Sequence, residues 1–447
     1  MAKTADAACV PRRTPPRRIL VLGAYGLIGA DVVRRLLADG CHVTGLGRNS
    51  KTAQSILPQI DWIIQDMAGL CDESAWQDLL EHVDIVVNCA GALQESYQDN
   101  LDVVHHRAIK ALAAACQAMK IGLIQISAVG ALEDATTAFM RTKARGDAAI
   151  RHSGAEYWIF RPGLVLSPTA YGGTALLRML AAFPVVQPIA QPDAQLQTVS
   201  VFDVANAVSM AARGKIPPNT EYDLVEDHPQ QLRQVVALQR QWLGFSPARL
   251  ELAMPGWLLF LTRHGADLLG RLGWRSPLRS SAIQALKDGV VGDPLPWKAI
   301  SGAGLSSMAE TLAIMPVGVE DRQFARMALL MPFVVAVLFV FWLISGIVGF
   351  YKIDTAAKIL ENTGWSHGFA VASVGFWSLV DLVIAGALMV RKYAARACWA
   401  MVIVSVVYLI SATFTVPQLW SDPLGPLIKV LPGVVLALIA RVMLESR

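Results

Sequence analysis

Charged residues are scarce in this sequence of 447 amino acids. Asp, Glu, Lys and Arg together make up 17% of it, apolar residues make up 54%, and the mean hydropathy is +0.43. A soluble enzyme ordinarily carries about 25% charged residues, so we predict that part of the chain lies in a membrane. The net charge of +4 is small, and no stretch concentrates basic residues. These features argue against nucleic acid as a partner.

Metal-ligand spacing and a leader segment are also missing. None of the six cysteines has C-x-x-C or Cys/His spacing, so we expect reduced, mostly buried thiols and no metal site. They are Cys9, Cys41, Cys71, Cys89, Cys116 and Cys398. Residues 1–18 are rich in proline and arginine and lack an apolar segment. We predict a disordered basic tail there rather than a signal peptide.

Three glycines follow a short apolar run near the N-terminus. The run, residues 19–22, has the length of a buried strand, and residues 30–38 after the glycines favour a helix. The glycines are Gly23, Gly26 and Gly29, with G-x-x-G-x-x-G spacing. Glycine permits a tight strand-to-helix turn and lets a pyrophosphate approach the backbone, next to the positive helix N-terminus. With a second strand at 42–46, this pattern predicts nucleotide binding, although a purely structural βα turn would share the glycines.

The end of the second predicted strand has no acidic residue. A site that prefers NAD usually carries an acid there to bind the adenosine ribose, whereas this chain has Gly47-Arg48-Asn49. Arginine can bind a 2′-phosphate with two hydrogen bonds and stack on adenine. We therefore predict that Arg48 makes NADP(H) the favoured cofactor over NAD(H). A solvated arginine at a strand end is the alternative interpretation.

Four more apolar runs alternate with helical segments up to residue 163. They are residues 62–66, 84–91, 123–127 and 157–163. This alternation predicts a doubly wound parallel sheet of the α/β Rossmann class. Asp66, at the end of the third strand, is expected to accept a hydrogen bond from the adenine amino group. His105 and His106 have no third ligand nearby and are expected to face solvent rather than bind a metal.

These residues resemble the short-chain dehydrogenase/reductase superfamily, in particular its extended and atypical branches, over about residues 17–310. The landmarks are Gly23-x-x-Gly26-x-x-Gly29, Asp66, Asn88-Cys-Ala-Gly91, Ser127, Lys143, Arg161-Pro-Gly163 and Val201-Phe-Asp-Val-Ala205. The pattern is most similar to the branch that holds the NAD(P)H-binding accessory subunit of respiratory complex I and NmrA-type sensors. The cofactor-binding residues implied are Gly23, Tyr25, Gly26, Leu27, Ile28, Gly29, Arg48, Asp66, Asn88, Ala90, Gly91 and Lys143.

One position departs from the catalytic pattern that the resemblance implies. The superfamily uses a serine and Tyr-x-x-x-Lys, in which the tyrosine is the general acid and base, but here the stretch is Phe139-Met-Arg-Thr-Lys143. Phenylalanine has no ionisable proton, so it cannot transfer one. Ser127 and Lys143 remain the catalytic candidates, and Lys143 can still bind the nicotinamide ribose. Tyr171 or Tyr97 is a candidate substitute for the proton donor; packing in a loop is the default for both.

The composition becomes strongly apolar after Arg326. Four segments are long enough to span a bilayer as helices, which predicts an all-α four-helix transmembrane domain over residues 327–447. They are residues 327–350, 368–390, 397–416 and 424–440. Basic residues gather at the ends on one side: Arg322, Arg326, Arg391, Lys392, Arg396, Arg441 and Arg447. By the positive-inside rule, both termini and the nucleotide-binding domain are expected in the cytoplasm of a cell with an inner membrane.

The four-span tail resembles the DoxX-like membrane family over about residues 325–445. Some members of that family associate with quinone-linked oxidation. Asp381 interrupts the second span, and an acid at that depth is costly unless it faces a cavity or a partner. It is a candidate for a proton or quinone role, and a hydrogen bond to another helix is the structural alternative.

The remaining residues are assigned to domains by their pattern. We predict a Rossmann domain over 19–243 and a substrate lobe with a connector over 244–326. Residues 224–242 have helical spacing, and residues 258–272 form an amphipathic helix that lies on the membrane or packs as a lid.

Two functions of different classes remain open. The first is a membrane-anchored NADP(H)-dependent oxidoreductase whose substrate is lipophilic, such as a quinone, an isoprenoid or a lipid-linked carbonyl. The second is a non-catalytic NADP(H)-binding sensor or assembly factor at the membrane with a membrane-protein partner, which Phe139 favours. A third possibility is that the membrane domain acts alone and the Rossmann domain is a scaffold.

Overall fold

A computed structural model of the chain describes residues 16–92, 94–95, 100–274, 280–423 and 425–445. The predicted basic tail lies almost entirely outside these residues. The N-terminal part forms a seven-stranded parallel sheet in the order β11-β6-β5-β4-β1-β2-β3. The strands are β1 (Arg18–Leu22), β2 (His42–Gly47), β3 (Asp61–Ile64), β4 (Ile85–Asn88), β5 (Gly122–Ile126), β6 (Tyr157–Pro162) and β11 (Thr220–Leu224).

The sheet has the strand order of a Rossmann fold, which confirms the predicted class. From β1 the chain runs outward through β2 to β3. It then returns to β4, on the other side of β1, and continues outward in the opposite direction, so the strand order reverses between β1 and β4. Ligands of open α/β sheets bind in the crevice at that reversal, beyond the carboxyl ends of the strands. The central strands are apolar runs with almost no exposed surface, because helices cover both faces. The candidate glycine turn follows β1 and therefore lies at this crevice.

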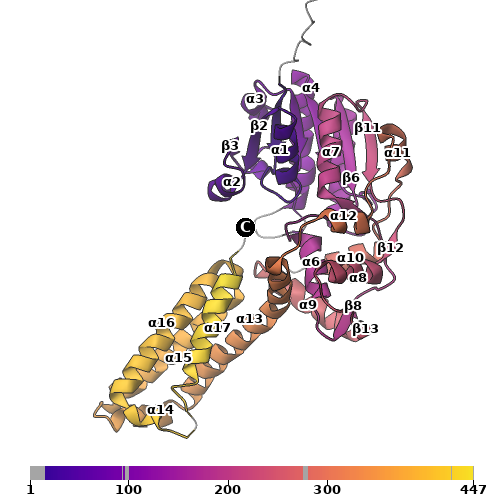
Figure 1. Cartoon of the computed structure of the whole chain (residues 1–447). Coiled ribbons are helices and arrows are strands. Elements are labelled where there is room, and N and C mark those ends of the chain that lie inside the picture. The colour runs from indigo at the N-terminus through magenta and orange to yellow at the C-terminus, as the bar shows by residue number, and fades with distance from the viewer. Residues whose placement is uncertain (1–15, 93, 96–99, 275–279, 424, 446–447) are drawn as a thin grey trace, which may run out of the picture.

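Helices cover the two faces of the sheet in separate layers (Figure 1). On one face α1 (Gly29–Ala38) packs against α7 (Val201–Ala212), and their aliphatic side chains meet those of β1 and β4 in one core cluster. The other face is covered by α3 (Ser74–Leu80), α4 (Ala108–Met119) and α5 (Ala138–Ser153). Two short elements, α2 (Ser50–Ile56) and η1 (Met67–Gly69), flank β3.

A second lobe with its own core follows β6. Its pairs of short strands are β7 (Leu164–Leu166) with β10 (Thr198–Ser200), β8 (Val186–Ile189) with β13 (Leu250–Ala253), and β9 (Gln195–Leu196) with β12 (Gln230–Gln231). Its helices are α6 (Gly172–Ala181), α8 (Leu232–Trp242), α9 (Gly256–Arg271), α10 (Ser280–Asp288) and α12 (Met308–Ile314). The short helix α11 (Leu295–Ser301) packs instead against the edge strand β11 of the sheet. The lobe core takes aliphatic residues from α6, α8 and α12, so it draws on both sides of residue 243.

The helix expected over residues 224–242 is shorter than its spacing suggests. Leu224 ends the edge strand β11, and residues 230–231 form β12, so only α8 is helical. The strand was missed because Thr220, Glu221, Tyr222 and Asp223 are only partly buried and show no apolar alternation. By contrast, α9 matches the amphipathic helix predicted at 258–272 to within two residues at its N-terminus.

The C-terminal part is a helical bundle that projects from the lobe (Figure 1). Among the described residues three helices are long and apolar enough to cross a membrane: α13 (Val319–Tyr351), α15 (His367–Met389) and α16 (Arg391–Thr415). At 1.5 Å per residue, α13 is about 50 Å long, whereas the hydrocarbon core of a bilayer is about 30 Å thick. The first turns of α13, which carry Glu320, Asp321 and Arg322, therefore extend beyond the membrane toward the lobe.

The fourth predicted span is shorter than expected. Its helix, α17 (Val430–Met443), has 14 residues, and Leu424 lies outside the described residues. Pro432 falls in the first turn of α17, where a proline breaks no helical hydrogen bond. The guanidinium of Arg391 donates to the carbonyl of Leu444 over 2.7 Å, so α17 ends beside the N-terminus of α16. The far side of the bundle holds α14 (Ile353–Glu361) and η3 (Pro417–Trp420).

Candidate nucleotide-binding site

The glycine turn after β1 packs tightly against the loop after β4, at the crevice. Gly23 adopts a φ of 68°, and a Cβ on it would lie 2.8 Å from the Cα of Ala90 in the loop after β4. A Cβ on Gly29 would lie 2.3 Å from the carbonyl oxygen of Gly23. A Cβ on Gly26 would meet only that same oxygen, at 3.0 Å. Two glycines thus let the turn close, while Gly26 faces open space before the first turn of α1.

The remaining turn residues and the end of β2 form the expected adenosine side of the crevice. The hydroxyl of Tyr25 accepts the backbone N–H of Arg48 at 3.0 Å, and its ring packs over Gly47 and tilts toward Trp62. Leu27 and Ile28 are half-buried, and Ile28 packs against the core. The guanidinium of Arg48 lies 3.8 Å from the carboxylate of Asp66 at the end of β3, and both side chains are exposed.

Asp66 has a structural contact as well. Its carboxylate accepts the backbone N–H of Ala68 at 3.0 Å and caps the short helix η1. Its other oxygen faces Arg48. The structure therefore brings Arg48 and Asp66 together at the carboxyl ends of β2 and β3, which is the place where the sequence predicts the adenosine end of the cofactor.

The loop after β4 is fixed from both sides. The amide of Asn88 accepts the backbone N–H of Ala90 at 3.0 Å and donates to Gln125 on β5 at 2.8 Å. Asn88 is buried, so these bonds satisfy its amide inside the protein. They hold Ala90 against Gly23 and leave Gly91 as the next residue along the crevice.

Lys143 lies at the opposite end of the crevice from Arg48. Its ammonium group donates to the carbonyl of Ile126 at 2.8 Å, and a Cβ on Gly91 would lie 3.5 Å from its Nζ. Lys143 is buried; burial lowers its pKa, while the neighbouring Asp147 and Cys89 raise it. Its place beside Gly91 fits a contact with the nicotinamide ribose.

Phe139 lies one helical turn before Lys143 on α5. Its ring packs edge-on against His105, with 5.3 Å between the ring centroids. The phenylalanine at the position where the superfamily has its catalytic tyrosine thus has a packing partner. No proton can be transferred from this side chain.

The prediction that both histidines face solvent is wrong for His105, whereas His106 is partly exposed. His105 is buried in the π-helical turn Val103–Arg107, where its Nε2 accepts the backbone N–H of Ala92 and its Nδ1 pairs with the hydroxyl of Thr142 at 2.9 Å. Burial and the nearby charge of Lys143 lower its pKa to about 2, so the imidazole is neutral. The absence of a third metal ligand in the sequence could not reveal this burial, because the partners of His105 are a backbone N–H and a hydroxyl from other elements.

Ser127 is bound to a buried acid that the sequence did not single out. Its hydroxyl donates to Asp147 at 2.6 Å, and the guanidinium of Arg161 on β6 lies 3.8 Å from the same carboxylate oxygen. The second oxygen of Asp147 has no hydrogen-bond partner among the described residues. Asp147 follows Lys143 by four residues and Phe139 by eight, so helical spacing places all three on one face of α5.

Asp147 should make the stability of the protein depend on pH. Its burial raises its pKa from 3.8 to about 6, against the opposing effects of Ser127 and the nearby cations. The folded protein then binds this proton more tightly than the unfolded chain does. The free energy of unfolding therefore falls as the pH rises from about 4 to about 6, by on the order of 3 kcal/mol.

The Asp147→Asn variant should lack this fall in stability. We expect its thermal midpoint, followed by tryptophan fluorescence from pH 4 to 7.5, to change less than that of the unmodified chain. Asp134→Asn, at an exposed position, is the control and should track the unmodified protein. Parallel curves for all three proteins would contradict the assignment.

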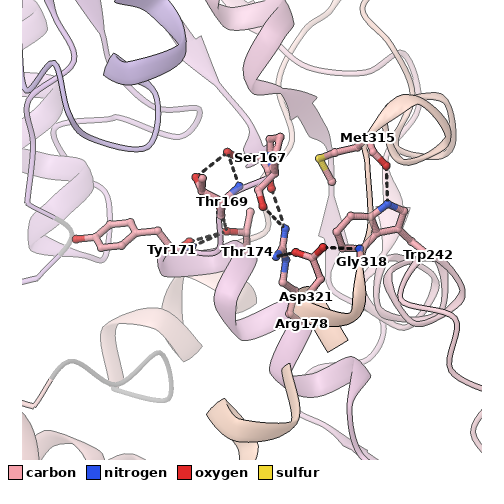
Figure 2. A network of polar contacts seen from close by, with 10 residues as sticks. Ser167, Thr169, Tyr171, Thr174, Arg178, Trp242, Met315, Gly318 and Asp321 are labelled. Atoms are coloured by element: carbon pink, nitrogen blue, oxygen red, sulfur yellow. Dashed lines mark hydrogen bonds and ion pairs between the residues drawn. The ribbon is translucent and has the colours of Figure 1, made fainter. Parts of the chain in front are cut away.

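Arg178 of α6 links the loop after β7 to the membrane helix α13 (Figure 2). The backbone carbonyls of Ser167 and Pro168 accept the guanidinium of Arg178, which also binds Asp321 in the first turn of α13 at 2.6 Å. The second carboxylate oxygen of Asp321 accepts the backbone N–H of Gly318 at 2.9 Å. Arg178 also lies 4.9 Å from the ring centroid of Trp242.

Of the two tyrosines considered as substitute proton donors, the structure describes only Tyr171. Tyr171 stands on this same loop, at the start of α6, with an exposed ring that points away from Arg178 (Figure 2). Its backbone N–H bonds to Thr174 at 3.0 Å. Tyr97 lies outside the described residues. Tyr171 as a proton donor stays a prediction.

Asp381 lies between two spanning helices. Its carboxylate accepts the hydroxyl of Ser345 on α13 at 2.6 Å. Next to Ser345 the helices approach closely, because a Cβ on Gly346 would lie 2.7 Å from Leu382 of α15. Small residues at such crossings let membrane helices pack backbone to backbone. Ser345 is thus the partner that the structural interpretation of Asp381 requires. A role of Asp381 in proton or quinone chemistry stays a prediction.

Two protein families match separate parts of the chain. The NAD(P)H-binding family matches residues 23–183, and the DoxX-like family matches residues 339–438. The predicted combination of an NAD(P)-binding Rossmann domain and a DoxX-like domain is confirmed. Because the DoxX-like match covers the long apolar helices, it also supports a membrane-bound protein.

Two curated relatives match short segments of the chain. A sterol-4-alpha-carboxylate 3-dehydrogenase (decarboxylating) of Dictyostelium discoideum is 30% identical over 93 residues, which are 19% of this chain and 28% of that protein. An epimerase family protein of Staphylococcus epidermidis is 33% identical over 76 residues, which are 17% of this chain and 23% of that protein. The chain thus matches only about a quarter of the length of these relatives.

Solved structures share the fold over a longer stretch. The UDP-glucose 4-epimerase of Thermus thermophilus, in complex with NAD, has a TM-score of 0.51 and 18% identity over 68% of this chain and 99% of its own. The NADPH-dependent quinone oxidoreductase of Escherichia coli, complexed with NADPH, has a TM-score of 0.50 and 19% identity over 66% of this chain and 98% of its own. These likenesses show the short-chain dehydrogenase/reductase and epimerase type of fold.

Proposed function

We propose that this chain, an NAD(P)-binding Rossmann domain joined to a DoxX-like membrane domain, is an NADP(H)-dependent oxidoreductase of a lipophilic substrate. The observation that carries the proposal is the place of Lys143. It is buried beside Gly91 at the carboxyl edge of the sheet, in a domain whose lobe is bonded to a membrane helix. The substrate class is a quinone, an isoprenoid or a lipid-linked carbonyl. The name of the Dictyostelium relative gives a sterol carboxylate, which is also lipophilic.

The residues around the crevice support a division of roles. The glycine turn and the N-terminus of α1 would bind the pyrophosphate, and Arg48 would bind a 2′-phosphate with Asp66 beside it. Lys143 would bind the nicotinamide ribose from the other end. The nicotinamide supplies a hydride, and the protein has to orient it and exclude water.

A quinone is the acceptor that best suits the missing tyrosine. A carbonyl that receives a hydride becomes an alkoxide and needs a proton donor at once, which Phe139 cannot provide. A quinone that receives a hydride becomes a stabilised quinol anion, which can take its proton from solvent. Direct transfer to a quinone therefore places the smallest demand on this site.

The preference for NADP(H) should depend on Arg48. We expect Arg48→Ala to weaken NADPH binding by about 10- to 100-fold, since a charge-assisted hydrogen bond contributes about 1.5–3 kcal/mol. NADH binding should change by less than about threefold, because NADH has no 2′-phosphate. Both dissociation constants are measured by nucleotide fluorescence titration of the full chain in detergent. Arg34→Ala, at an exposed position on α1, is the control; equal weakening of both nucleotides would contradict the preference.

A non-catalytic NADP(H) sensor or assembly factor at the membrane is the second candidate. The packing of Phe139 on His105 favours it, because the ring has a structural role and no proton to give. The lobe would then report nucleotide binding to a membrane-protein partner through α13. Both candidates require nucleotide binding, so turnover is what separates them.

Turnover is tested with the full chain reconstituted in vesicles that contain a quinone. We expect sustained NADPH oxidation, followed at 340 nm, and its loss in Lys143→Ala. Lys110→Ala, at an exposed position on α4, is the matched control and should keep the rate of the unmodified chain. NADPH binding without oxidation of any lipophilic acceptor would favour the sensor.

We also propose four membrane crossings with both termini in the cytoplasm. The basic side chains of Arg322, Arg326, Arg391 and Lys392 lie at the helix ends nearest the lobe, and these ends follow the positive-inside rule. The return of α17 to Arg391 supports the fourth crossing, although α17 alone is about 21 Å long. An inner membrane is the location that fits a domain dependent on cytoplasmic NADPH.

A further inference from the structure

Helix α9 carries its large apolar side chains on the outside. Trp257, Phe260, Leu261 and Leu268 are 66%, 51%, 59% and 61% exposed. Their spacing places them on one face of the helix, and we call these four residues the α9 stripe. The buried residues of α9 are the small Ala266 and Gly270. A helix of a soluble domain ordinarily shows the opposite arrangement, with large apolar residues inside.

The strand that leads into α9 continues this exposed apolar character. Leu250 and Leu252 of β13 are both exposed and lie two residues apart, so they share one side of the strand. The backbone N–H of Met254 donates to the carbonyl of Ile189 in β8, and Pro255 is the N-cap residue of α9. Figure 1 shows α9, β8 and β13 at the end of the lobe beside the start of the bundle.

The C-terminal end of α9 is bonded to the membrane domain. The carbonyl of Leu272 accepts the backbone N–H of Arg391 at 3.0 Å, and the indole of Trp274 donates to the carbonyl of Met389 at 2.6 Å. Met389 ends α15 and Arg391 begins α16, so both contacts lie where two spanning helices leave the bilayer. The guanidinium of Arg391 also faces the Trp274 ring. The C-terminal end of α9 therefore lies at the height of the membrane surface.

Charge and composition at the stripe suit a lipid headgroup region. Arg263 and Arg271 lie on α9, and Arg249 directly precedes β13. Asp267, the acidic residue of α9, is bonded to Ser280, so its carboxylate is turned toward α10. Tryptophan and basic residues on an amphipathic helix are typical of the boundary between headgroups and acyl chains.

We propose that α9 lies in the surface of the bilayer that α13, α15 and α16 cross, with the α9 stripe inserted among the lipids. This second contact would fix the lobe against the membrane, so that the crevice opens next to the lipid phase. The contact does not depend on the nucleotide chemistry proposed above. Protein-only alternatives are a lid over the crevice and a dimer contact between two copies.

The test uses the full chain in nanodiscs of phosphatidylcholine and phosphatidylglycerol that contain a trace of alkyne-bearing phosphatidylglycerol. Leu261 is replaced by the photoreactive residue p-benzoylphenylalanine, and irradiation is followed by detection of the alkyne on the protein. We expect covalent capture of the lipid. The same replacement of Leu295, which is 68% exposed on α11, is the matched control and should capture at least ten times less.

Three results would overturn the proposal: no lipid adduct at position 261, a crosslinked dimer in its place, or an adduct within the same chain. A second variant tests the stripe itself. Trp257→Ser combined with Phe260→Ser should reduce lipid capture at position 261 at least fivefold. That chain should still float with vesicles, because α13, α15 and α16 are unchanged. Undiminished capture would mean that the stripe does not hold α9 at the surface.

Discussion

Replacing Gly26 with aspartate should abolish nucleotide binding and leave the protein folded. A side chain at Gly26 would meet only the carbonyl oxygen of Gly23, at 3.0 Å, and otherwise extends into open space in front of α1. That space is where a pyrophosphate would contact the unpaired N–H groups of the helix N-terminus. The added carboxylate would occupy the anion position itself and repel the phosphates. At the same time it would satisfy the helix dipole, so the fold should be kept.

The expected loss is large because several interactions fail together. Charge-assisted hydrogen bonds contribute about 1.5–3 kcal/mol each, so losing two of them weakens binding by about 100-fold or more. The dissociation constants of NADPH and NADH are measured on the full chain, and both should increase. Gly368→Asp is the control, since a Cβ there has no neighbour within 4 Å and Gly368 lies in the first turn of α15, in the membrane domain. Unchanged affinity in Gly26→Asp would mean that the glycine turn is only structural.

The other two glycines would not serve this test. Gly23 has a positive φ and touches the backbone of Ala90, and Gly29 touches the carbonyl of Gly23. Side chains at these positions would force the turn open and disturb β1, β4 and α1 together. The G-x-x-G-x-x-G spacing alone does not distinguish the three glycines. In the structure Gly23 and Gly29 are packing positions, whereas Gly26 faces open space.

Most of the sheet could be predicted from the sequence because its central strands are apolar and buried on both faces. The five strands β1, β2, β4, β5 and β6 are short apolar runs between turn residues, and such runs are visible without any knowledge of the partners. The edge strand β11 was missed, since Thr220–Leu224 carries polar side chains at an open edge. The apolar side chains themselves, rather than burial, decided which strands the sequence revealed, because β3 is only partly buried and residues 62–64 still form a visible apolar run.

The buried polar residues of the site were harder to predict. His105 and Asp147 are polar residues on helices, and such residues are exposed in most proteins. Their partners, Ala92 and Thr142 for His105 and Ser127 and Arg161 for Asp147, come from other elements. For Asp147 a local signal did exist, because it continues the Phe139 and Lys143 face of α5.

Contacts between the lobe and the membrane helix leave no local signal at all. Arg178 and Asp321 are 143 residues apart in the chain, and each is an ordinary polar residue of an amphipathic segment. Their pairing depends on how the lobe and α13 pack, which neither hydropathy nor spacing encodes. The consequence of breaking it can be predicted from the structure.

Arg178→Met should destabilise the protein by about 3–5 kcal/mol, the usual effect of removing one partner of a buried ion pair. Only 3% of the Arg178 side chain is exposed. Its loss leaves Asp321 without its cation and the carbonyls of Ser167 and Pro168 without a donor. The matched control is Arg233→Met, which removes an exposed ion pair with Asp193 and should cost about 1 kcal/mol or less.

A double-mutant cycle separates the ion pair from the general packing of Arg178. The free energy of unfolding is measured by denaturant titration in detergent for Arg178→Met, Asp321→Leu and the double variant. Because each single variant leaves an uncompensated buried charge, the double variant should be more stable than the sum of the two effects predicts, by about 1–3 kcal/mol. Strict additivity would show that the two residues act independently. In that case the loop that carries Tyr171 would not be tied to the membrane helix by this contact.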